Sequence, residues 1–118
     1  MSVTKAALDN ALAAIFVPPL MLGLRSGLSE VRDGGYKQQR LSLTSPASAD
    51  GVRGMANNAE IRFGPFITDF EDDIDSWIVL SKGLVVADGP LDRPRRPQAG
   101  EETIFHPGEL SVGIKEKE

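Results

Sequence analysis

The sequence predicts a mainly β protein: a small, jelly-roll-like antiparallel β-sandwich preceded by a short N-terminal helix. Three observations support this prediction. Short apolar segments recur along the 118 residues, 12 glycines and 8 prolines separate them, and a strong hairpin signal lies at residues 74–91. We expect six or seven short strands, which is the pattern of a sandwich.

The hairpin signal contains the only tryptophan, Trp77, and two apolar runs at residues 77–80 and 84–87. The loop 81–83 between them ends in Gly83, and glycine readily adopts the positive φ that a bulged hairpin turn needs. Both runs are almost continuously apolar, so we expect two strands that are covered on both faces. A buried helix is the alternative, which Gly83 and the turn residues 88–90 disfavour.

The N-terminal region, residues 1–17, predicts a helix that is capped by Ser2 or Thr4 and ends at Ala14 or Ile15. Its apolar stripe has spacings of four and three residues: Leu8, Leu12 and Ile15. We expect this stripe to dock against the rest of its own domain rather than against a partner.

The remaining strands are expected where short apolar or alternating segments lie between turns, at residues 20–24, 36–43, 59–63, 103–105 and 110–114. A turn is expected at residues 33–35, and Ile61 and Phe63 are expected to point inward. Residues 44–58 are rich in Ser, Ala, Gly and Asn and predict an exposed loop, and residues 115–118 predict a solvated tail. This length predicts a single domain over residues 1–118.

Composition excludes several classes of function. The absence of cysteine excludes disulfides and thiolate chemistry, and a single histidine excludes the usual zinc sites. The formal net charge of -4 argues against nucleic acid as the partner. No apolar run approaches the roughly 20 residues of a membrane span, and no secretory signal is recognised. We therefore expect assembly in a cytoplasm, with neither nucleic acid nor membrane as partner.

A dense acidic run precedes the hairpin: Asp69, Glu71, Asp72, Asp73 and Asp75. Alternating carboxylates are typical of calcium loops, but Ile74 stands where the sharp turn of an EF-hand requires glycine. Leu80 likewise stands where a bidentate carboxylate would close the site. A loosely held divalent ion is the alternative to a solvated or partner-facing patch, and we expect no cofactor.

A basic segment follows the hairpin and contains Arg93, Arg95 and Arg96 between prolines that favour an extended shape. Contact with nucleic acid is one interpretation, which the short patch and the 6% aromatic content disfavour. We hypothesise instead a head-to-tail contact between identical subunits, in which these arginines meet residues 69–75 of the next subunit.

His106 is the one candidate for general acid–base chemistry near neutral pH. No nucleophile elbow, phosphate-binding loop or other paired motif accompanies it. The sequence therefore predicts no enzymatic activity, and a small hydrolase that uses His106 is the alternative.

Four short motifs occur in a characteristic order: residues 33–38 (DGGYKQ), 58–63 (NAEIRF), 74–78 (IDSWI) and 104–110 (IFHPGEL). With the N-terminal helix and first strand, they resemble, over residues 7–114, the small bacteriophage proteins that are labelled tail-fibre or head-fibre proteins. Members have a Gly-Gly-Tyr turn before a strand, a strand ending in Phe, a tryptophan-containing strand and a late Pro-x-Gly-x-Leu element. The loop 25–31 is shorter than in the family, and the acidic run is not part of its pattern.

The resemblance implies a non-enzymatic virion structural protein with a β-sandwich core, which contacts other capsid or tail proteins and copies of itself as a homo-oligomer. The short chain favours a capsid decoration, head-fibre base, spike base or connector. The alternative is a tail-fibre or host-adsorption module that binds carbohydrate, for which Tyr36 and Trp77 are the obvious aromatic candidates. We expect Trp77 to lie inside.

Overall fold

The computed structural model describes residues 4–32 and 34–115, in which it places one helix and ten strands. In chain order these elements are α1 (Lys5–Ile15), β1 (Leu20–Ser26), β2 (Ser29–Glu30), β3 (Gln39–Leu41), β4 (Ala47–Ala49), β5 (Val52–Ala56), β6 (Ile61–Phe63), β7 (Ile74–Ser81), β8 (Leu84–Arg95), β9 (Thr103–Phe105) and β10 (Ser111–Lys115).

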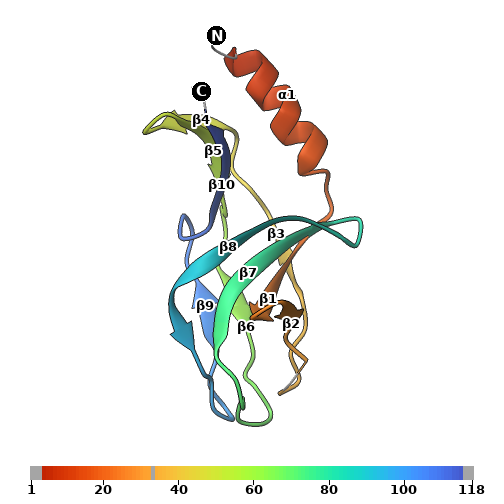
Figure 1. Cartoon of the computed structure of the whole chain (residues 1–118), viewed down its shortest axis with the longest axis vertical. Helices are drawn as coiled ribbons and strands as arrows, with labels where there is room; N and C mark the ends of the chain where they lie inside the picture. The colour runs from red at the N-terminus through yellow and green to blue at the C-terminus, as the bar shows by residue number, and fades with distance from the viewer. Residues whose placement is uncertain (1–3, 33, 116–118) are drawn as a thin grey trace.

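The predicted fold class is confirmed, because the chain is mainly antiparallel β with several packed sheets and one short N-terminal helix (Figure 1). A five-stranded sheet has the order β2-β1-β7-β8, with β3 also paired to β1. A three-stranded sheet has the order β10-β5-β4, and β6 pairs with β9. The jelly-roll arrangement is not confirmed, since these sheets have five, three and two strands rather than four each.

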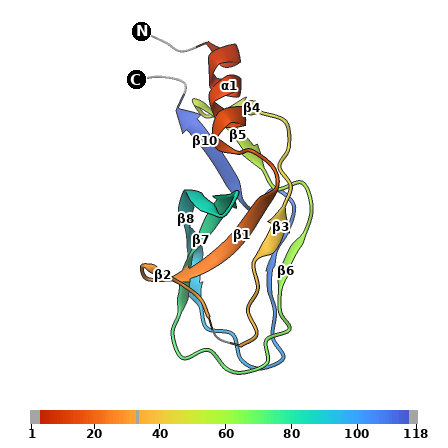
Figure 2. The same ribbon diagram turned by 90° about the vertical axis from the view of Figure 1, so that its right-hand side faces the viewer.

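The molecule is elongated, with extents of 50 × 25 × 24 Å. The helix and the three-stranded sheet lie together at one end, and the loops β2–β3, β6–β7 and β8–β9 lie at the other (Figures 1 and 2). The two ends therefore present different surfaces: a sheet backed by a helix at one end, and a group of loops at the other.

The helix begins as predicted at Thr4, whose hydroxyl oxygen accepts a hydrogen bond of 3.2 Å from the amide of Ala7. The other predicted cap, Ser2, lies outside the described residues. Leu8 and Leu12 are buried against the rest of the chain, as expected. Ile15 is 38% exposed, contrary to the prediction, because Phe16 rather than Ile15 turns into the core at the helix end.

The predicted hairpin is formed by β7 and β8, but its turn is one residue shorter than expected. Ser81 pairs with Leu84, so only Lys82 and Gly83 form the turn, with φ values of 52° and 81°. Two successive positive φ values are the type I′ pattern that matches the twist of paired strands. The turn expected at residues 88–90 is wrong, because β8 continues through these residues. An edge strand tolerates Pro90, which has no N–H to donate to a neighbouring strand.

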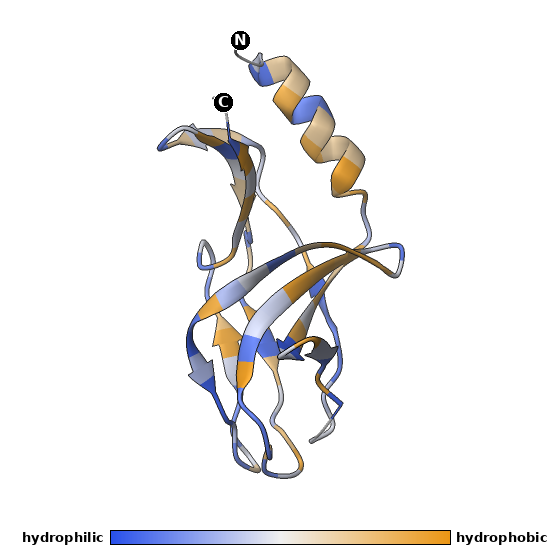
Figure 3. Ribbon diagram, viewed as in Figure 1, coloured by the Kyte–Doolittle hydropathy of each residue, from blue (hydrophilic) through white to orange (hydrophobic). Residues whose placement is uncertain are grey.

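Coverage on both faces is found for β7 and not for β8. The last five residues of β7, 77–81, are all buried, so the side chains on both faces of the sheet are covered there. β8 is an edge strand, and its first residues Leu84 and Val85 are 71% and 48% exposed. Figure 3 shows the hydrophobic residues of both strands running up to the turn.

Three further predictions about elements need correction. Residues 44–58 are not an exposed loop, because they contain the hairpin β4–β5 with Asp50 and Gly51 at its turn. The strand expected at residues 36–43 is reduced to β3. Lys115 is the last residue of β10 rather than part of a tail, whereas residues 116–118 of that tail and Asp33 of the expected turn lie outside the described residues.

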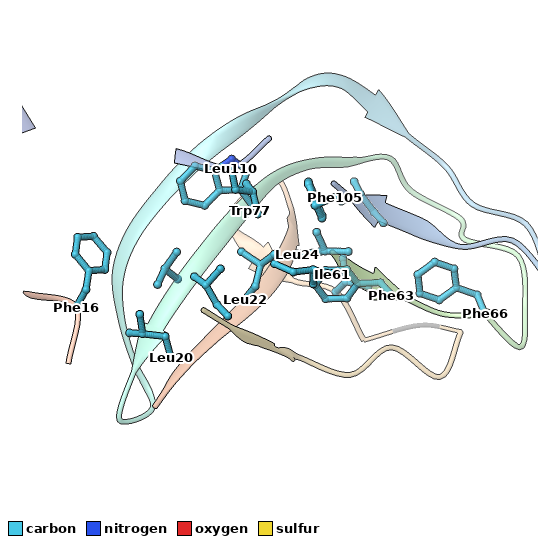
Figure 4. Packing of buried hydrophobic residues seen from close by; sticks show 14 of the residues in the cluster. Phe16, Leu20, Leu22, Leu24, Ile61, Phe63, Phe66, Trp77, Phe105 and Leu110 are labelled. Carbon is cyan, nitrogen blue, oxygen red and sulfur yellow. The ribbon is translucent and has the colours of Figure 1, made fainter. Parts of the chain in front are cut away.

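The core lies between the β1–β7–β8 part of the large sheet and the β6–β9 pair (Figure 4). Phe63 and Phe105, on neighbouring strands β6 and β9, meet edge to face with ring centroids 6.1 Å apart. Tyr36 stacks on Phe63 at 5.9 Å. As predicted, Ile61 and Phe63 point inward, and the remaining core side chains include Leu20, Leu22, Leu24, Trp77 and Leu110.

Candidate functional site

The acidic run lies in the β6–β7 loop and, at Asp75, on the start of β7, and several of its carboxylates bond to other parts of the chain. Asp69 accepts a 2.8 Å hydrogen bond from the amide of Ala99, and Asp75 accepts one of 3.1 Å from the amide of Gly27. These bonds tie the β6–β7 loop and the start of β7 to neighbouring turns. These carboxylates therefore have a structural role in the single chain.

The basic segment meets the acidic run inside the same chain. Arg96 Nε lies 3.0 Å from Asp73 Oδ1. The two residues flank the open end of the β7–β8 hairpin, where Ile74 pairs with Arg95. The pairing of these two strands therefore brings Asp73 and Arg96 together. The head-to-tail contact stays a prediction. Within these two charged segments, the side chains of Glu71, Asp72 and Arg93 make no hydrogen bond or ion pair with described residues.

Arg95 is held beside the core by contacts within its own chain. Its Nη2 lies 3.3 Å from Asp92 Oδ1, and its guanidinium carbon lies 5.8 Å from the centroid of the Phe105 ring. Partial burial raises the pKa of Asp92, but hydrogen bonds from Arg95 and from the amide of Arg93 outweigh it and leave that pKa lowered.

Within residues 4–32 and 34–115, no group of three or more histidine or acidic side chains is placed to hold a metal ion. Nor does this part of the chain contain a helix of the length and apolarity that a bilayer crossing requires.

His106 lies on the surface after β9, with its side chain 63% exposed. Its Nδ1 is 3.6 Å from Glu60 and its Nε2 is 3.9 Å from Glu109, both too long for hydrogen bonds. Its backbone carbonyl accepts a 2.9 Å bond from the amide side chain of Asn57. The imidazole of His106 therefore lies between two exposed carboxylates, and its backbone carbonyl helps to hold the turn.

Neither aromatic candidate for sugar binding is fully exposed. Trp77 is only 9% exposed, which confirms that it lies inside, although it lines a shallow hollow of about 270 Å³ beside Leu91 and Phe105. Tyr36 is half-buried. Its hydroxyl donates a 2.6 Å bond to Glu30, and burial, followed by that bond, raises the pKa of Tyr36.

The three-stranded sheet carries a surface that the sequence did not reveal. One face packs on α1, where Arg53 Nε lies 2.8 Å from Asp9 Oδ1. Because side chains alternate along a strand, the register gives the opposite face a uniform set of small residues: Ala47, Ala49, Val52, Gly54, Ala56, Ser111 and Gly113.

We call this set of seven residues the bare face. A hollow of about 420 Å³ lies over it, and no other described element covers it (Figures 1 and 2). The alternation at Val52, Gly54 and Ala56 was the available signal, but alanine and glycine have low strand propensity, so the segment resembled a loop. The bare face is the best candidate for a contact surface in the described chain.

Comparisons with models of protein families, with curated proteins and with solved structures find no match to this chain.

Proposed function

We propose that the chain is a non-enzymatic structural protein of a bacteriophage virion that works through protein–protein contacts, as a capsid decoration, head-fibre base, spike base or connector. The observation that carries the contact role is the bare face at one end of the elongated molecule. The order of motifs over residues 7–114 supports the assignment to a virion.

The bare face suits close packing against another protein. Its side chains are small, so a second sheet or a helix is able to approach the backbone closely. The face has Lys115 at one corner and no carboxylate among its seven members, so little charge must be desolvated when it is covered. On the other side, α1 and the Arg53–Asp9 ion pair brace the sheet.

The surroundings of the ionisable side chains that could act in catalysis favour a structural role for this chain. His106 lies exposed on a turn, and Asp69 and Asp75 bond to backbone amides. A carbohydrate-binding module is less well supported, because stacking on a sugar needs an exposed ring face, whereas Trp77 is buried and the half-buried Tyr36 stacks on Phe63.

Mass measurement of the purified chain, mixed in turn with candidate capsid and tail proteins, tests the proposal. We expect a defined complex with one of them. Ala49→Glu places a charge on the bare face and should abolish that complex, whereas Ala14→Glu, at an exposed position on the outer side of α1, should preserve it. Failure to bind any of these proteins, or equal binding by both variants, would reject the proposal.

A further inference from the structure

We infer that β10 pairs with β10 of a second copy of this chain, antiparallel and about a two-fold axis at Gly113. The inference rests on the proposed contact role of the three-stranded sheet. It identifies one partner of that sheet, a second copy of the chain, and the register in which the two β10 strands pair.

The outer edge of β10 carries unpaired backbone groups. Among described residues β10 pairs only with β5, in a register without shifts. The amide of Asn57 donates to the carbonyl of Leu110, so the backbone of Leu110 points towards β5. Alternation along the strand then directs the N–H and C=O groups of Ser111, Gly113 and Lys115 to the open edge. Figure 2 shows no element alongside that edge.

The other long edge of the protein is protected against strand pairing, and the edge of β10 is not. β8 contains Pro90 and Pro94, four charged residues after Ala87 and two register shifts against β7. Proline, charge and bulges are the devices by which edge strands avoid pairing. β10 has no proline and no register shift, and Lys115 is its single charge. This contrast indicates that the edge of β10 is open for a strand.

The residues of β10 are complementary to themselves in one register. An antiparallel pair centred on Gly113 sets Gly113 opposite Gly113 and Ser111 opposite Lys115, so that no like charges face each other. All three outward-pointing residues then form hydrogen-bonded pairs, which supply about six backbone hydrogen bonds.

The same two-fold symmetry places equivalent faces of the two sheets on the same side. A two-fold axis perpendicular to the sheet joins two three-stranded sheets into one continuous sheet, with both bare faces on one side and both helices on the other. A Cβ at position 113 would lie 2.6 Å from Val52 Cγ1, so this position requires glycine. Because glycine has no side chain, the bare face stays flat at the two-fold axis, where the two copies meet.

Directed cross-linking tests the register in a chain that has no cysteine of its own. Ser111→Cys and Lys115→Cys chains are prepared separately, and each is treated with a short thiol cross-linker alone and after mixing. We expect cross-linked dimers in the mixture and only background in each variant alone, because position 111 faces position 115 of the other copy. Equal yields in all three samples, or none in any, would overturn the inference.

Charge at the exposed position 111 gives a second measurement. Ser111→Glu sets two carboxylates opposite the two Lys115 side chains of the dimer and should tighten the dimer dissociation constant by about 2- to 30-fold. Ser111→Lys should weaken it by a similar factor. Sedimentation equilibrium of both variants and of the unmodified chain checks this, and equal dissociation constants, or monomers throughout, would contradict the register.

These experiments need no other virion protein. A chain that remains monomeric overturns the β10 pairing and leaves the proposed function standing if the chain still binds a capsid or tail protein. A chain that dimerises through β10 but binds no capsid or tail protein would support the β10 pairing and reject the proposed function.

Discussion

Gly89 on β8 lies directly opposite Trp77 on β7, and a Cβ atom at Gly89 would lie 2.4 Å from Cζ2 of the indole. The ring therefore lies across the glycine, where any other residue would displace it. This relationship places the only tryptophan under the edge strand, and it links the position of β8 to the packing of the core.

Gly89→Ala should destabilise the protein by about 1–3 kcal/mol, because the new methyl group overpacks the site and forces the indole outward. Tryptophan fluorescence should shift to the red in the folded protein, and urea unfolding gives the change in stability. Asp88→Ala, at the exposed neighbouring position, removes only the 3.4 Å surface ion pair with Arg25 and should cost under about 1 kcal/mol with unchanged emission. Unchanged emission and stability in Gly89→Ala would show that this packing is wrong.

Asn57→Ala should cost about 3 kcal/mol, because the buried amide of Asn57 joins β5 to the turn before β10. Its Nδ2 donates to the carbonyls of Ala59 and His106, and its Oδ1 accepts from the amide of Leu110. Asn58→Ala is the matched control, since the exposed Asn58 side chain makes a 3.3 Å bond to Leu43. Urea denaturation of both variants checks the prediction, which equal losses would refute.

Tyr36→Phe should remove a dependence of stability on alkaline pH. Burial and the bond to Glu30 raise the folded-state pKa of Tyr36 above the ordinary tyrosine value of 10.0. The folded protein then keeps a proton that the unfolded chain releases, so this contribution to stability is complete below about pH 10 and is lost as pH rises further.

At neutral pH the same variant should lose about 1–3 kcal/mol, because the amide of Leu24 loses its 3.0 Å acceptor. Unfolding measured between pH 8 and about pH 11 should show the unmodified chain losing its advantage over Tyr36→Phe. Parallel curves would mean that Tyr36 ionises equally in both states. Tyr36 is the only tyrosine, so its absorbance titration reports the folded-state pKa directly.

Asp9→Asn should weaken the docking of α1 at neutral pH and have little effect in acid. The hydrogen bond from Arg53 lowers the pKa of Asp9 below the ordinary aspartate value of 3.8. A lowered folded-state pKa gives stability that is present above the unfolded value and is lost as pH falls through the folded value. Thermal unfolding at pH 7 and about pH 3 checks this, with Asp72→Asn as the control; a pH-independent effect at Asp9 would contradict it.

The sequence predicted those elements whose signals are local. Thr4 is a helix cap whatever surrounds it, and Gly83 supplies a positive φ that a hairpin turn needs. β4 and β5 were missed because their small residues become strands only by pairing with each other and with β10, which is distant in sequence. The edge position of β8 was missed for a related reason: an apolar run does not show how many neighbours a strand has.

The candidate site was harder to predict from the sequence than the fold, because it depends on how distant strands pair. The charged segments were visible as runs, and the hairpin explains why Asp73 meets Arg96. The bare face required the pairing of Gly54 with both Ala47 and Gly113, which no local pattern contains.

Hydrogen exchange, measured on the free chain and on its complex with a capsid or tail protein, tests the contact role of the three-stranded sheet most directly. The account predicts added protection of amides at residues 47–56 and 111–115, with little change at residues 64–73 and 96–102 in the loops at the opposite end. Protection confined to those loops, with the three-stranded sheet unchanged, would contradict it.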